Sequence, residues 1–228
     1  FIQLFTTIRF TQALNNSGFL SLCSFEKTSI KAGNAILEIY ETADFGVEIK
    51  SDDSPLTKAD LAAHNVIVDD LKKMTPDVPI LSEESANIPF NIRSQWNKYW
   101  LVDPLDGTKE FIEGVPNFVV SIGLVKNGYP ILGILYNPVT KELFSGSLAE
   151  GAYLNGDRIN CVEKSKLSEM VILNSRSETR RGLWEPYKNI FSDLKAVGSV
   201  AYKLGLTAAG KSDIFASLRP KNEWDICA

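Results

Sequence analysis

Two aspartates stand three residues apart in the segment DPLDGT (residues 103–108), which ends in a glycine and a threonine. Mg²⁺ takes oxygen ligands in octahedral geometry, and its protein sites combine a few carboxylates with backbone carbonyls and substrate phosphate. Pro104 holds Asp103 extended, and Gly107 lets the backbone turn sharply after Asp106. The two carboxylates can therefore point at one place, and the segment predicts a magnesium site.

The same segment has the features of a phosphate-binding turn. If a helix begins at Thr108, the free N–H groups of Gly107 and Thr108 face the carboxylates and can hold phosphate. A solvated surface turn is the alternative, because Asp and Gly are frequent in turns. An EF-hand calcium loop is excluded, since Val102 and Pro104 would take its first and third ligand positions. A nucleotide P-loop is excluded because no GxxxxGK sequence precedes a helix.

Three more carboxylates stand at the ends of apolar or helical segments. Asp60 lies at an expected helix start, Glu83 follows a short apolar strand, and Asp225 follows Trp224. Open sheets place ligands at the carboxyl ends of their strands, and surface charges seldom recur there so consistently. These residues therefore favour a metal site over a simple turn.

The composition leaves carboxylates as the main candidates for chemistry. The only histidine, His64, is expected to be exposed, which excludes a histidine-rich metal site and argues against a Ser-His-Asp triad. Cys23, Cys161 and Cys227 lack the spacing of zinc ligands and form a poor disulfide framework, which favours a reducing cytoplasm. The net charge of -4 provides no basic face for a nucleic-acid polymer.

The hydrophobic pattern predicts the elements that would bring these residues together. The chain has 228 residues, 44% of them hydrophobic, which is enough to bury a large core. Helices are expected over 27–41, from Lys58 to before Pro76, over 180–190 and over 200–209. Strands are expected over 47–50, 80–81, 99–102, 118–125, 131–136, 142–145, 170–173 and 213–217. Consecutive strands indicate an antiparallel sheet, and the mixed order predicts an α+β or layered α/β fold.

Six stretches resemble the inositol monophosphatase superfamily, and within it the CysQ-type 3'(2'),5'-bisphosphate nucleotidases. They are SPLTKAD (54–60), LSEES (81–85), WLVDPLDGTKEFI (100–112), GYPILGILYNPVTKELF (128–144), GSVAYKLGLTAAGKSDIF (198–215) and EWDICA (223–228). The residues KEF after DGT favour the nucleotidases, because inositol monophosphatases tend to carry Thr or Ala and then Asn there. The resemblance implies an α+β fold, a layered αβαβα sandwich of the sugar-phosphatase (inositol monophosphatase/fructose-1,6-bisphosphatase) type.

The resemblance also implies a set of oxygen ligands for two or three Mg²⁺ ions. The first ion would be held by Glu83, Asp103 and the backbone carbonyl of Leu105, and the second by Asp103, Asp106 and Asp225. Asp60 and Thr108 would orient the attacking water, and a third ion near Glu83 and Asp60 is left open.

The activity implied is a lithium-sensitive removal of the 3'-phosphate from adenosine 3',5'-bisphosphate, which gives AMP and phosphate. The residues expected to bind substrate are Gly107, Thr108, Ser199, Lys203 and Arg219. The two cations are expected at the other phosphate, with a solvated basic surface as the alternative. Trp224 is expected to pack in the core rather than on adenine.

Two departures from the superfamily leave the substrate preference open. Glu178 stands where a histidine is usual, and Lys221-Asn222 replaces a Gly-Pro-Thr-type stretch. The alternatives are an inositol monophosphatase or other sugar phosphatase, and an inactive fragment that binds nucleotide or protein.

The organisation expected is a phosphatase domain over residues 28–228, without the superfamily's C-terminal tail, preceded by a leader or non-native segment over 1–27. The apolar runs in that segment are too short for a spanning helix. We expect a cytoplasmic monomer or homodimer whose partner is a small nucleotide bisphosphate. Peripheral association with the inner membrane is left open.

Overall fold

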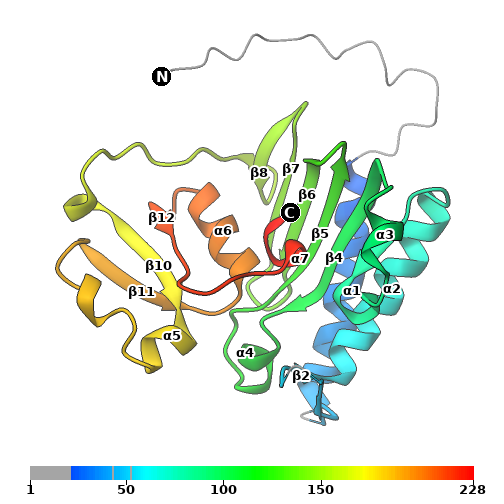
Figure 1. Cartoon of the computed structure of the whole chain (residues 1–228), viewed down its shortest axis with the longest axis horizontal. Helices are drawn as coiled ribbons and strands as arrows, with labels where there is room; N and C mark the ends of the chain where they lie inside the picture. The colour runs from blue at the N-terminus through cyan, green and yellow to red at the C-terminus, as the bar shows by residue number, and fades with distance from the viewer. Residues whose placement is uncertain (1–21, 43, 52) are drawn as a thin grey trace.

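Alternating layers of helices and sheets build the molecule, as the computed structural model in Figure 1 shows. The structure describes residues 22–42, 44–51 and 53–228. Helices α1 (Leu22–Thr42) and α2 (Lys58–Met74) cover one face of a seven-stranded sheet, and α6 (Val200–Ala208) lies between that sheet and a second sheet of three strands. The short helix α5 (Arg176–Arg180) packs on the smaller sheet. The expected αβαβα sandwich is confirmed.

The large sheet is antiparallel except at one pair of strands. Its order is β3 (Ile80–Ser82), β4 (Lys98–Asp106), β5 (Val119–Lys126), β6 (Tyr129–Asn137), β7 (Glu142–Ser147), β8 (Gly151–Leu154) and β9 (Asp157–Arg158). Only β3 and β4 run parallel. Seven consecutive residues of β5 are buried, because helices lie on both faces of the sheet.

The smaller sheet is parallel and has the order β11 (Asp193–Val197), β10 (Val171–Ser175), β12 (Ile214–Phe215). Strand β11 was missed from the sequence because it is an edge strand whose Asp193 and Lys195 are exposed. The remaining short elements are β1 (Glu48–Ile49), β2 (Pro55–Leu56), α3 (Phe90–Arg93), α4 (Thr108–Ile112), α7 (Glu223–Ile226) and the 3₁₀ turns η1 (Glu83–Ser85), η2 (Leu167–Glu169) and η3 (Glu185–Tyr187).

The prediction of a helix over residues 180–190 is wrong. Helix α5 ends at Arg180, and Gly182 follows with a φ of +73°, a left-handed conformation that ends a helix. The apolar residues Leu183, Trp184 and Tyr187 belong to a loop containing the single turn η3.

Helix α1 begins at Leu22, five residues before the expected start at Lys27. Phe25 is 3% exposed and packs on Trp100 of β4, with ring centroids 4.8 Å apart. Residues 22–27 are thus part of the helical layer, so the expected leader overlaps it. The rest of that expectation, residues 1–21, lies outside the described residues. Within the described ranges, no helix combines the length and apolar character needed to cross a membrane.

Replacing Phe25 by alanine tests whether the start of α1 belongs to the core. We expect Phe25→Ala to lower the free energy of unfolding by about 3–5 kcal/mol, because it removes a large buried ring. Cys23→Ala, at an exposed position of the same turn, should change it by less than about 0.5 kcal/mol. Urea denaturation measures both, and equal effects would place residues 22–27 outside the core.

Candidate metal centre

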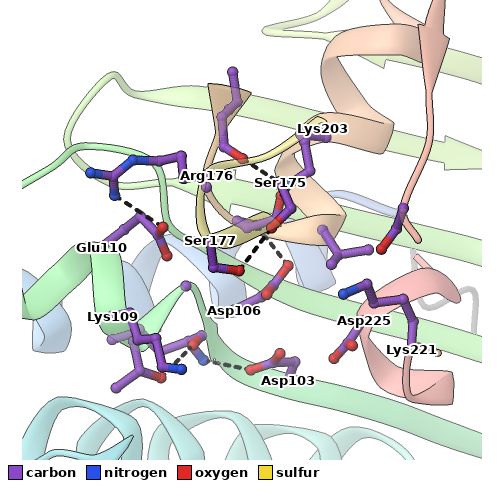
Figure 2. Close-up of a pocket in the computed structure, with 18 of the residues that line it drawn as sticks. Asp103, Asp106, Lys109, Glu110, Ser175, Arg176, Ser177, Lys203, Lys221 and Asp225 are labelled. Carbon is purple, nitrogen blue, oxygen red and sulfur yellow. Dashed lines mark hydrogen bonds and ion pairs between the residues drawn. The ribbon is translucent and has the colours of Figure 1, made fainter. Parts of the chain in front are cut away.

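Three carboxylates from different parts of the chain converge at one edge of the large sheet. Ligand oxygens of Glu83, Asp103 and Asp225 all lie within 4.8 Å of one another. Glu83 follows β3 and Asp103 lies on β4, so the parallel pairing of these strands brings them to the same edge. Asp225 comes from α7, which packs on β4 and β5 (Figure 2). A cluster of carboxylates this close together favours the binding of a cation.

Asp103 is the buried centre of this cluster. Its side chain is 2% exposed, and its Oδ1 accepts a hydrogen bond from the Leu105 N–H at 3.0 Å. Pairing between β4 and β5 is irregular between Asp103 and Asp106, so the regular ladder is interrupted at Pro104 and Leu105. Burial raises the pKa of Asp103 well above its usual range, and repulsion from Glu83, Asp106, Asp225 and Asp60 adds to the rise.

Asp60 and Thr108 form a hydrogen-bonded pair beside the cluster. The Thr108 hydroxyl donates to Asp60 Oδ1 at 3.0 Å and lies 3.3 Å from the carbonyl oxygen of Leu105. Asp60 Oδ2 accepts from the Thr57 N–H at 2.7 Å and the Thr57 hydroxyl at 2.6 Å, which completes the capping box of α2. Burial raises the pKa of Asp60, while the bonds from Thr57 act against the rise. The carboxylate is therefore fixed on one side and aimed at Thr108 on the other.

Asp106 points toward α6 rather than into the three-carboxylate cluster. Its Oδ2 accepts from the Ser199 hydroxyl and from the Ala201 N–H, both at 2.6 Å. No described residue hydrogen-bonds its Oδ1. Asp106 thus joins the large sheet to the start of α6, and one of its oxygens stays available to a cation.

Gly107 makes the turn between β4 and α4. It caps α4 with a φ of +109°, and a Cβ there would lie 2.7 Å from the carbonyl oxygen of Asn117. A residue with a side chain would be strained and would also collide with the backbone. The prediction that this glycine permits the sharp turn after Asp106 is confirmed.

Glu83 has a cationic neighbour in this structure. Lys50 Nζ lies 2.9 Å from Glu83 Oε1 and 2.8 Å from Glu84 Oε1. Burial raises the pKa of Glu83, and the hydrogen bond and charge of Lys50 act against that rise. His64, expected to be exposed, is half-buried, with Nδ1 2.9 Å from the Ser82 hydroxyl oxygen next to Glu83.

Asp225 is held by the packing of α7. Its Oδ2 accepts from the Asn222 N–H at 3.1 Å, and the Ser121 hydroxyl donates to the Trp224 carbonyl at 3.2 Å. Trp224 packs against a buried cluster that includes Leu81 and Leu101, which confirms its expected place in the core. Arg93 of α3 forms an ion pair with Glu223 at the start of the same helix.

A pair of glycines admits the chain after α7 onto the sheet. Gly123 on β5 and Gly133 on β6 are register partners, and a Cβ at Gly123 would lie 2.5 Å from Cys227 Sγ. A Cβ at Gly133 would lie 1.9 Å from the Ala228 carbonyl oxygen. The close approach of this segment, and so the position of Asp225, requires both glycines.

A cleft of about 340 Å³ opens above the carboxylates. Besides Glu83, Asp103, Asp106 and Asp225, its lining includes Gly107, Thr108, Ser199 and Lys203 from the sequence-predicted set. Arg219 is exposed and is not among the lining residues. The cleft is also lined by residues not predicted from the sequence to bind substrate: Lys109, Glu110, Ser175, Arg176, Ser177, Ser217 and Lys221.

Glu178 is a buried carboxylate outside the cleft lining. It is 1% exposed, and its oxygens accept from Trp184 Nε1 at 3.0 Å, the Ser217 hydroxyl at 3.0 Å and the Leu218 N–H at 3.2 and 3.3 Å. These bonds join α5 to the segment after β12. The unusual Glu at this position therefore has a structural role that sequence alone did not reveal.

The profile of the inositol monophosphatase family matches residues 22–228. The chain belongs to the inositol monophosphatase family. The 3'(2'),5'-bisphosphate nucleotidase CysQ of Escherichia coli K12 is 40% identical over 202 residues, which cover 86% of this chain and 80% of that protein.

Two solved structures share the fold of this chain. The suhB extragenic suppressor protein of Bartonella henselae superposes with a TM-score of 0.80 at 30% identity, covering 91% of this chain and 81% of that one. CysQ of Bacteroides thetaiotaomicron gives a TM-score of 0.74 at 34% identity, covering 91% and 83%. A suhB protein and a CysQ member of the inositol monophosphatase family therefore both have this layered architecture.

The stability of this family member without metal should fall as the pH rises. Burial raises the pKa of Asp225 to about 7, and the neighbouring carboxylates Asp106 and Glu83 add to the rise. In the unfolded state the pKa of aspartate is about 3.9, so between about pH 4 and 7 the folded state binds more protons than the unfolded state. The free energy of unfolding therefore falls as the pH rises through this range. Urea unfolding at pH 5 and pH 8 in EDTA should show the loss.

Asp225→Asn is the control for this pH dependence. The amide cannot titrate, so the variant should lose less stability between pH 5 and pH 8 than the wild type. Added Mg²⁺ should also reduce the loss in the wild type, because a cation replaces the proton among the carboxylates. An unchanged pH dependence in Asp225→Asn would contradict the assignment.

Adding one methyl group at Gly123 should weaken metal binding without touching a carboxylate. Gly123→Ala forces Cys227 and α7 away from the sheet, and we expect the affinity for Mg²⁺, measured by calorimetry, to fall roughly tenfold, as for other supporting residues of metal sites. The double variant Gly123→Ala/Cys227→Gly removes the side chain that the new methyl meets, so it should recover most of the affinity. Failure of that rescue would locate the defect elsewhere.

Proposed function

We propose that this chain is a Mg²⁺-dependent phosphatase that removes the 3'-phosphate of adenosine 3',5'-bisphosphate and releases AMP and phosphate. The observation that carries the proposal is the hydrogen-bonded Asp60–Thr108 pair beside the Glu83, Asp103 and Asp225 cluster. The substrate class is supported by the 40% identity to a bisphosphate nucleotidase. Cytoplasmic location, peripheral membrane association and the oligomeric state stay predictions.

The donor set fits Mg²⁺. It offers oxygen atoms only, and no cation among the described residues pairs with Asp103 or Asp225. Two or three ions would be held by Glu83, Asp103, Asp106, Asp225 and the carbonyl of Leu105. Bound Mg²⁺ would supply Lewis acidity, which lowers the pKa of water and neutralises phosphate charge.

Asp60 and Thr108 orient the attacking water in this proposal. Because the Thr108 hydroxyl donates its proton to Asp60 Oδ1, its oxygen is left to accept a hydrogen bond from water. The bonds from Thr57 keep Asp60 in place, so the acceptor direction of Thr108 is fixed before substrate arrives. The pair therefore positions a water for attack on phosphorus from the α4 side of the cleft.

Residues on two turns hold the phosphate that reacts. The N–H groups of Gly107 and Thr108 stand at the start of α4, and Ser199 caps α6 across the cleft. Lys203 Nζ donates to the Val197 carbonyl at 2.9 Å and to the Ser199 carbonyl. Burial lowers the pKa of Lys203 to about 8. Lys203 thus supports the turn that presents Ser199, besides lining the cleft itself.

An inositol or other sugar phosphatase is the second candidate function. It is favoured by the fold match to an IMPase of Thermotoga maritima, with a TM-score of 0.79 at 31% identity over 89% of this chain and 78% of that one. Purified chain with Mg²⁺ should release phosphate from adenosine 3',5'-bisphosphate faster than from inositol 1-phosphate or fructose 1,6-bisphosphate. The reverse order would favour the second candidate.

Asp103→Asn should reduce Mg²⁺-dependent phosphate release by more than roughly 100-fold, because changes to residues that merely support metal ligands already cost 10–100-fold. Thermal unfolding without metal should remain cooperative, since the amide keeps the shape of the buried side chain. A folded wild type without turnover on any of the three substrates would instead support an inactive nucleotide- or protein-binding chain.

A further inference from the structure

Among the described residues, four cations line the cleft, and two of them already bind other groups of the protein. Arg176 Nη1 lies 3.0 Å from Glu110 Oε1, and its Nη2 lies 2.8 Å from Glu113 Oε2. Lys203 is 2% exposed and donates to two backbone carbonyls. Lys109 and Lys221 are exposed, and neither forms an ion pair or side-chain hydrogen bond with another described residue. These two lysines are the cations free to meet an anionic ligand.

The two free lysines lie on opposite sides of the carboxylates (Figure 2). Lys109 follows Thr108 on α4, the side from which the oriented water approaches phosphorus. Lys221 lies beside Asp225, across the cleft. In phosphoryl transfer the attacking and leaving oxygens are roughly in line, on opposite sides of phosphorus. The leaving alcohol, and whatever else it carries, therefore lies toward Lys221.

The backbone of Lys221 is held at a set place relative to the carboxylates. The next residue, Asn222, caps α7 and donates its N–H to Asp225 Oδ2 at 3.1 Å. Only three residues thus separate the lysine from Asp225 of the cluster. The Ser121–Trp224 hydrogen bond anchors α7 to β5. A cation in this position can bind a second anionic group carried by the leaving alcohol.

We propose that Lys221 binds the phosphate that is not hydrolysed, and so makes the enzyme prefer a nucleoside 3',5'-bisphosphate over a 3'-monophosphate. This inference rests on the proposed function. It assigns to Lys221 a role that the sequence suggested for Lys203 and Arg219. Lys203 is engaged by two backbone carbonyls, and Arg219 lies outside the cleft lining. Lys221 is a specificity residue here, because it touches the part of the substrate remote from the reacting phosphorus.

Two substrates that differ by one phosphate test the proposal. The ratio of kcat/KM for adenosine 3',5'-bisphosphate to that for adenosine 3'-monophosphate is measured for wild type, Lys221→Gln, Lys221→Arg and Arg219→Gln. Lys221→Gln should lower the ratio roughly 10- to 100-fold, the loss expected for a hydrogen bond to a charged group. The change should fall on the bisphosphate, with the monophosphate values preserved, and Lys221→Arg should retain most of the preference.

A binding measurement separates recognition from turnover. AMP keeps the remote phosphate, so AMP should raise the thermal midpoint of the wild type in Mg²⁺ but have a smaller effect on Lys221→Gln. Inorganic phosphate should affect both equally. Lys195→Gln, an exposed lysine on β11 outside the cleft, is the matched control and should behave as wild type in every assay.

Each other outcome overturns a distinct claim. A ratio unchanged by Lys221→Gln, or lowered by Arg219→Gln instead, would overturn the role of Lys221 and leave the nucleotidase proposal standing. Equal loss on both substrates would show a general structural effect and overturn the specificity role. A wild type that hydrolyses inositol 1-phosphate but neither adenosine compound would overturn the proposed function, and the inference with it.

Discussion

Glu83, Asp103 and Asp225 bring carboxylate oxygens within 4.8 Å of one another at a partly or fully buried edge of the large sheet. Without a cation these groups repel one another and lose their hydration, which is why the pKa of each is raised. Much of the surrounding structure keeps the carboxylates together despite that repulsion. Such a site lowers the free energy of unfolding of the metal-free protein, and binding of a divalent cation raises it again.

Three structural features hold these carboxylates close together. The parallel β3–β4 pair brings the strand ends to one edge, whereas the rest of the sheet is antiparallel. Asp106 bonds the start of α6 and thereby couples that edge to the smaller sheet, on which α6 packs. The glycine pair Gly123 and Gly133 admits the chain after α7 close to β5 and β6. Residues far from the chemistry therefore decide where Asp225 lies.

The polar side of the cleft is built differently from its carboxylate floor. Glu178 ties α5 to the segment after β12, and Glu110 and Glu113 engage Arg176. Hydrogen bonds and ion pairs thus fix this wall, whereas Lys221 lies across the carboxylates from it and pairs with no other described residue (Figure 2). This arrangement matches the proposed chemistry, in which the α4 side of the cleft holds the reacting phosphate and the side of Lys221 binds the rest of the substrate.

Features that depend on near neighbours along the chain could be predicted from the sequence. The helix start at Asp60, the turn at Gly107 and the carboxylates of β4 and of the segment after β3 follow from spacing within a few residues. The motifs around them identified the family and its fold. The tertiary structure alone decided that Asp106 faces α6, that Glu178 is buried, and that Lys221 rather than Arg219 lines the cleft. Those outcomes depend on the direction of each side chain and on segments tens of residues away, which local pattern does not encode.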